Sequence, residues 1–87
     1  MIELRWTRRF ERDFLRLPEG AQEAAAEKLD ILALAPRHPS LRLKRVGGTV
    51  DLWELSVNMQ VRITLRFLDE THIELRRIGS HKVLDQP

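Results

Sequence analysis

The sequence predicts an α+β fold in which an N-terminal strand and a helical hairpin pack on one face of an antiparallel sheet, in the order β-α-α-β-β-β. Three observations support this prediction. Apolar and charged side chains alternate over residues 2–6, apolar positions recur with a helical period over residues 8–35, and alternation returns after Pro36. A period of 3.6 is typical of helices, whereas a period of two is typical of half-buried strands. Helices that cover one face of an antiparallel sheet define the α+β architecture.

The N-terminal half is predicted to form one strand and two helices. Thr7 follows the first strand and has a side chain that can cap a helix. Pro18 ends the first helix and is tolerated in the first turn of the second, which should extend to about Ala35. Such a short connection favours a hairpin. The apolar stripes of the two helices are Phe10, Phe14 and Leu17, followed by Ala21, Ala24, Ala25, Lys28, Leu29 and Leu32.

The C-terminal half is predicted to form four strands at residues 41–46, 50–57, 60–68 and 72–78. Turns are expected at Gly47–Gly48, Asn58–Met59 and Asp69–Glu70. Alternation sorts the strand residues onto two faces. The core set is Leu43, Trp53, Leu55, Val57, Val61, Ile63, Leu65, Phe67, Ile73 and Leu75, and the open set is Arg42, Lys44, Glu54, Ser56, Arg62, Thr64, Arg66, Glu74 and Arg76.

Length and composition narrow the class of protein. A chain of 87 residues is expected to form one domain, spanning residues 1–87. It lacks cysteine, has no apolar run long enough to span a membrane, and begins with alternating charges unlike a signal peptide. A cytoplasmic protein without a membrane partner is therefore expected. The net charge is only +2, but twelve of the fifteen basic residues are arginine, which makes forked contacts to phosphate.

The open face of the predicted sheet gathers arginines from several strands. Two interpretations remain open: a solvated face with arginines paired to Glu54 and Glu74, or a site for a polyanion. His81 follows the last strand, and a free imidazole titrates near pH 6.5, so it can move a proton. That combination suits RNA cleavage, in which the 2′-hydroxyl attacks the adjacent phosphate. The three histidines lack metal-ligand spacing and no glycine-rich phosphate loop is present, so no metal or cofactor is expected.

At this point the sequence resembles the RelE/ParE superfamily of type II toxins, from about Thr7 to Pro87. The resemblance lies in three places: Phe10, Phe14 and Leu17-Pro18; residues 53–64, WELSVNMQVRIT; and residues 78–81, IGSH. It implies a RelE-like fold and a toxin that cleaves messenger RNA on the ribosome. By position, Arg62 would stabilise the transition state, His81 would be the acid or base, and Lys44 would bind phosphate or assist the base.

Further basic residues of the chain are candidates for RNA binding. The candidates for RNA binding are Arg42, Arg45, Arg66, Arg76 and Lys82. Lys82 stands where many relatives have aspartate, and the chain has no tyrosine, so the assignment of acid and base stays open. An acidic cognate antitoxin is the expected partner of a toxin that is monomeric when free. Two alternatives remain: a ParE-like toxin that binds gyrase, or an inactive antitoxin-binding module.

Aromatic residues bear on how RNA would be held. All five aromatics, Trp6, Phe10, Phe14, Trp53 and Phe67, belong to the core-facing set by periodicity. A protein that reads single-stranded RNA by itself usually offers exposed aromatic rings for stacking. We therefore expect weak, salt-dependent binding to free RNA through phosphates, and productive cleavage only on a scaffold such as the ribosome.

Overall fold

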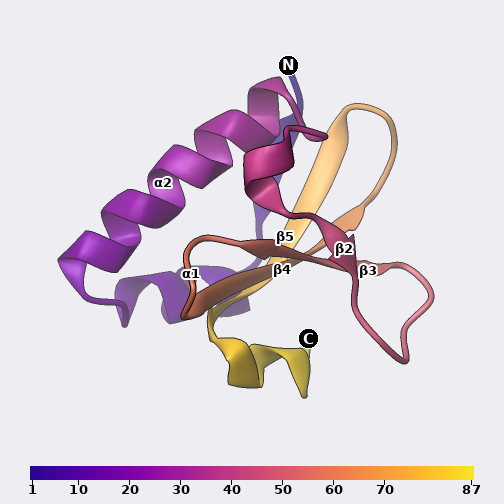
Figure 1. Cartoon of the computed structure of the whole chain (residues 1–87). Helices are drawn as coiled ribbons and strands as arrows, with labels where there is room; N and C mark the ends of the chain where they lie inside the picture. The colour runs from indigo at the N-terminus through magenta and orange to yellow at the C-terminus, as the bar shows by residue number, and fades with distance from the viewer.

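Two helices and five strands form the fold in the computed structural model, which describes residues 1–87 (Figure 1). The elements are β1 (Glu3–Trp6), α1 (Arg8–Leu15), α2 (Glu19–Leu34), the 3₁₀ turn η1 (Pro39–Leu41), β2 (Lys44–Arg45), β3 (Leu52–Ser56), β4 (Val61–Phe67), β5 (His72–Ser80) and the 3₁₀ turn η2 (His81–Leu84). The strands form one sheet in the order β1-β5-β4-β3-β2. The predicted α+β class and the order of its main elements are confirmed.

The sheet departs from the prediction at β1, which pairs with β5 in parallel rather than antiparallel orientation, from Glu3 opposite His72 to Trp6 opposite Leu75. All other pairs of neighbouring strands are antiparallel. No hairpin turn connects β1 to β5, so nothing in the local chain requires them to run in opposite directions.

The helices begin and join as the sequence suggests. The Thr7 hydroxyl accepts a hydrogen bond from the Phe10 N–H at 3.1 Å, and it donates one to the Leu75 carbonyl at 2.8 Å. At the other end of α1, the Gln22 amide donates to the Phe14 and Leu17 carbonyls at 3.0 and 3.1 Å. These bonds fix the start of α2 against the end of α1. None of the helices has the length and apolar character needed to cross a membrane.

The core lies between the helices and one face of the sheet. Its fully buried members include Phe10 of α1, Leu32 of α2 and Leu55, Ile63, Leu65, Ile73 and Leu75 of the strands. Two of the five aromatics were wrongly expected to be buried, because Trp6 is 42% exposed and Phe67 is 36% exposed. Trp6 lies on the edge strand and Phe67 ends β4, so neither is covered on all sides. Each still packs edge-on against another ring, Trp6 on Phe10 at 4.8 Å and Phe67 on Trp53 at 6.0 Å.

The strand predicted at 41–46 is largely wrong. Only Lys44 and Arg45 pair with β3, and the chain before them forms η1. The His38 Nδ1 atom accepts from the Ser40 N–H at 3.1 Å, which starts this 3₁₀ turn, and Arg42 closes it with a left-handed φ of 50°. Leu41 is buried, but it belongs to this 3₁₀ turn and not to a strand. Alternation of apolar and polar residues alone therefore gave a wrong prediction here.

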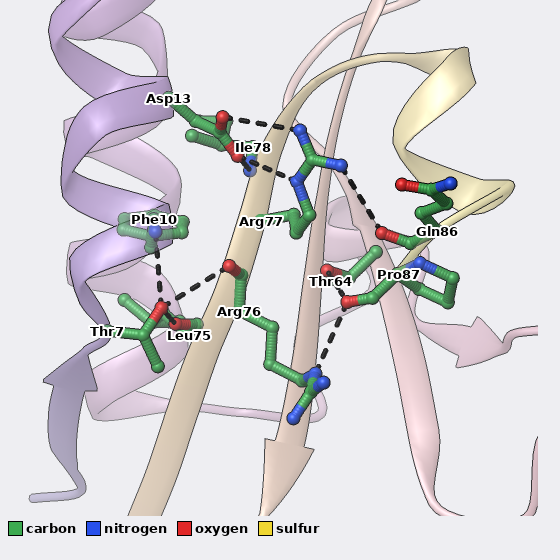
Figure 2. Close-up of polar contacts among 10 residues, drawn as sticks. All are labelled: Thr7, Phe10, Asp13, Thr64, Leu75, Arg76, Arg77, Ile78, Gln86 and Pro87. Atoms are coloured by element: carbon green, nitrogen blue, oxygen red, sulfur yellow. Dashed lines mark hydrogen bonds and ion pairs between the residues drawn. The ribbon is translucent and has the colours of Figure 1, made fainter.

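The last strand and the tail cover part of the face that was expected to be open. A β-bulge places Arg76 as an extra residue, since Thr64 lies opposite Arg77 while Leu65 lies opposite Leu75. After η2 the chain folds back, and the Pro87 carbonyl accepts from the Thr64 hydroxyl at 3.3 Å and from Arg76 Nε at 3.2 Å (Figure 2). Thr64 is consequently buried rather than solvated, and Glu54, which lies on β3 opposite Thr64, is buried as well.

Candidate functional site

A cleft of about 460 Å³ brings together basic side chains from several elements. It lies where the end of β3 and the turn into β4 face α2, η1 and β2. Four of its lining residues are cations and one is a carboxylate. The lining comprises Lys28, Ser40, Arg42, Lys44, Glu54, Ser56, Val57, Asn58, Met59 and Arg62.

The strand register sets the positions of the polar groups at the cleft. Lys44 of β2 lies directly opposite Glu54 of β3, and Ser56 of β3 lies opposite Arg62 of β4. Because side chains alternate along a strand, Glu54 and Ser56 lie on the same face and both line the cleft. Lys28 reaches it from α2, where its ammonium donates to the Ser40 carbonyl at 3.1 Å.

Glu54 and Arg62 form the most enclosed part of the cleft. The Glu54 side chain is 8% exposed and its Oε1 lies 3.9 Å from Arg62 Nε. Arg62 also donates from Nη1 to the Asn58 carbonyl at 2.7 Å. Arg42 and Lys44 are exposed and belong to none of the ion pairs in the protein. The cleft therefore has an excess of positive charge with one carboxylate near its base.

The turn from β3 to β4 holds Arg62 in place. The Asn58 side-chain oxygen accepts from the N–H groups of Gln60 and Val61, both at 2.8 Å. An asparagine side chain that accepts hydrogen bonds from the backbone in this way stabilises a turn locally. The turn thereby fixes the backbone that carries Arg62 into the wall of the cleft.

The structure brings some of the predicted site residues together and separates others. Arg62, Lys44 and Arg42 line the cleft. His81 does not line it and is exposed as the first residue of η2. Since Gly79 of β5 lies opposite Arg62, His81 leaves the strand at the same end of the sheet as the cleft.

The other predicted RNA-binding residues lie outside the cleft. Arg45 points to the opposite side of the sheet, with its guanidinium 5.5 Å from the centre of the Trp53 ring. Arg66 pairs with Asp51 at 3.7 Å and with Glu74 at 3.4 Å. Arg76 shares the same Glu74 oxygen at 3.0 Å, so part of the expected arginine face is neutralised by acids. Lys82 lies on η2 and is exposed without an ion pair.

Sequence reasoning missed Lys28 as a site residue and regarded Glu54 only as a partner for surface arginines. A signal existed for Lys28, because it occupies a position in the apolar stripe of α2 where a charged residue needs an explanation. Glu54 gave no such signal. It is flanked by β2 and β4, where it lies opposite Lys44 and Thr64.

Several solved structures, among them toxins and toxin–antitoxin complexes, have a similar fold. A chain of the intact E. coli RelBE toxin–antitoxin complex matches with a TM-score of 0.73 and 17% identity over 92% of this chain and 96% of that chain. The YoeB/ParE toxin from Agrobacterium tumefaciens matches with a TM-score of 0.76 and 15% identity, covering 92% and 99%. YafQ from E. coli strain BL21(DE3) matches with a TM-score of 0.75 and 11% identity, covering 97% and 98%.

These likenesses define the class of fold: the chain has the α+β fold of the RelE-type toxins. The resemblance expected from the sequence is thus confirmed at the level of structure. No protein-family model matches the sequence, and no curated protein matches it.

Proposed function

We propose that this chain is the toxin of a toxin–antitoxin pair and that it cleaves messenger RNA on the ribosome without a metal or cofactor. The observation that carries the proposal is the cleft, in which Lys28, Arg42, Lys44 and Arg62 surround the buried Glu54. The four cations suit the binding of a polyanion, and the carboxylate suits a reaction in which a proton is transferred. The toxin fold raises the expectation that this polyanion is RNA.

The reaction follows from the chemistry of RNA. The 2′-hydroxyl loses its proton and attacks the adjacent phosphorus, while the bond to the 5′-oxygen breaks and that oxygen takes a proton. The products are a 2′,3′-cyclic phosphate and a free 5′-hydroxyl. Arg62 and Lys44 would neutralise the charge that develops on the phosphorane, which is commonly worth 10²–10³ in rate per well-placed group.

Two residues are proposed to move the protons. Glu54 is the one carboxylate that lines the cleft, so we assign it as the base that accepts the 2′-hydroxyl proton. His81, at the same end of the sheet, is assigned as the acid that protonates the leaving 5′-oxygen. Each transfer should contribute about 10²–10⁴ in rate.

The partner is proposed to be an acidic antitoxin. The structural neighbours include RelE–RelB complexes from E. coli and Pyrococcus horikoshii OT3, so toxins of this fold assemble with an antitoxin. An acidic segment would neutralise the cleft and deny it to RNA.

The test is cleavage of one messenger RNA, naked and on translating ribosomes, by purified variants. Arg62→Ala should lower kcat about 10²-fold or more, and Glu54→Gln and His81→Gln should do likewise. Arg45→Ala and Glu70→Gln are matched controls, because both residues are exposed and lie outside the cleft.

Other outcomes would replace the proposal. Undiminished cleavage by a folded Arg62→Ala protein would remove the cleft as the active site. Induction that stops DNA replication and leaves messages intact would favour a gyrase-binding toxin. Induction without any effect on growth would favour an inactive antitoxin-binding module.

A further inference from the structure

A second concentration of positive charge lies on α1, β5 and η2, away from the cleft. Three shallow hollows of about 260–280 Å³ adjoin there and share Arg9, Asp13, Arg16 and Arg77 among their linings. None of their residues lines the cleft. We name this surface the basic face and define it by its six cations: Arg9, Arg12, Arg16, Arg76, Arg77 and Lys82.

The basic face holds more positive charge than the whole chain. Its six cations are accompanied by two carboxylates, Asp13 and Glu74, so its local excess is four against a net charge of +2 for the protein. The cleft adds a further excess of three. The rest of the chain therefore carries a net negative charge, and the excess of positive charge is concentrated in these two places.

The two arginines of the β-bulge form the fixed centre of the basic face. Figure 2 shows Arg77 between α1 and the C-terminal segment, with Nε 2.9 Å from Asp13 Oδ2 and with Nη1 donating to the Gln86 carbonyl at 3.3 Å. Arg76 is held by Glu74 and by the Pro87 carbonyl. These contacts order both side chains before any ligand arrives.

The remaining cations of the basic face are free to bind. Arg9, Arg12, Arg16 and Lys82 are exposed and belong to none of the ion pairs in the protein. The three arginines follow one side of α1, each about one helical turn from the next, and together they span roughly 10 Å. A row of guanidinium groups with this spacing matches successive phosphates along a nucleic-acid strand.

The lining of the hollows indicates which polyanion fits. Two of the three hollows have no hydrophobic residue, and none has an aromatic one. A protein partner would need a buried apolar centre, and single-stranded RNA would need rings on which its bases stack. Double-stranded RNA needs neither, because it is held through phosphates and 2′-hydroxyls.

We propose that the basic face binds the phosphate backbone of double-stranded RNA, as a docking surface separate from the cleft. The inference rests on the proposed function, and it supplies the contact to the structured RNA scaffold on which the message would be cut. The cleft would then act on a single strand while the basic face holds the neighbouring duplex.

The test is binding of an uncleavable RNA hairpin duplex by a triple variant, Arg9→Gln/Arg12→Gln/Arg16→Gln. Glutamine keeps helix propensity, and circular dichroism verifies the fold. Arg5→Gln/Arg37→Gln/Arg45→Gln is the matched control, since it removes the same charge from residues outside both sites. The face variant should lose affinity about tenfold or more, and the slope of log K against log salt should fall by about 2–3.

Each result decides the proposal. An equal loss of duplex affinity in both triple variants would show that only net charge matters, and it would overturn the proposal. An unchanged affinity in both variants would also overturn it. A face variant that loses affinity for poly-glutamate but not for the duplex would assign the face to an acidic protein. The weak cleavage expected for naked RNA, which uses the cleft without the docking contact, should be unchanged in the face variant. If even the unmodified protein cleaves no RNA, the proposed function fails while the duplex measurement still stands.

Discussion

Replacing Asp13 by alanine should destabilise the protein more than any other change to a charged residue of α1. The Asp13 carboxylate is 6% exposed, contacts Arg77 at 2.9 and 3.3 Å, and accepts from the Ile78 N–H at 3.3 Å. Removing one partner of a buried pair costs about 3–5 kcal/mol. Arg77 is 19% exposed and keeps the Gln86 carbonyl, so it can be partly resolvated, and we expect about 3 kcal/mol.

Urea unfolding followed by tryptophan fluorescence measures this loss, because Trp6 packs against α1. For a chain of this size the same loss lowers Tm by roughly 12–24 °C. Asp51→Ala is the control: Asp51 is 60% exposed and lies 3.7 Å from Arg66, and such surface pairs are worth about 0–1 kcal/mol. Adding Arg77→Met to Asp13→Ala should cost less than the sum of the two changes. A loss below about 1 kcal/mol for Asp13→Ala would refute the view that this pair is desolvated and locks α1 to the bulge.

Two further predictions concern the end of β5 and the turn that precedes it. Gly79→Ala should cost about 1 kcal/mol in urea unfolding and shift the NMR signals of His81, because the added methyl group would lie 3.0 Å from Val83 Cγ1; unchanged stability and spectra would contradict this. The Thr71 N–H, followed by the His72 side chain, lowers the pKa of Asp69 from 3.8 to about 2. Its contribution to stability is therefore complete above pH 3.8 and is lost as the pH falls through about 2, and a carboxyl titration by NMR with a midpoint near 4 would disprove it.

The fold was predictable where local pattern and burial agree. Strand β4 alternates cleanly, and its apolar residues Val61, Ile63 and Leu65 are buried as expected. Residues 41–43 alternate just as well, but the chain there turns instead, because Pro39 and the His38 ring favour a 3₁₀ turn. The parallel pairing of β1 with β5 could not be predicted from the sequence. The paired residues are about seventy positions apart, and no turn between the two strands sets their relative direction.

The site was predictable only in part, for a related reason. Arg62 and Lys44 follow from strand alternation, and both line the cleft. Glu54 and Asp13 do not follow from it, because each is buried by elements other than its own. Asp13 reads as a solvated helix residue until Arg77 is placed beside it, 64 positions later. Pairings of this kind depend on the bulge in β5, which alternation alone does not reveal.

The position of β5 has a consequence for how the chain acquires its structure during synthesis. β5 lies between β1 and β4, and it supplies the buried residues Ile73, Leu75 and Ile78. Until the ribosome has released residue 80, β1 has no strand beside it and the helices cover an incomplete core. Contacts between such distant segments form late and slowly. A chain that ends before β5 should therefore lack part of its core, even though every residue that lines the cleft precedes that strand.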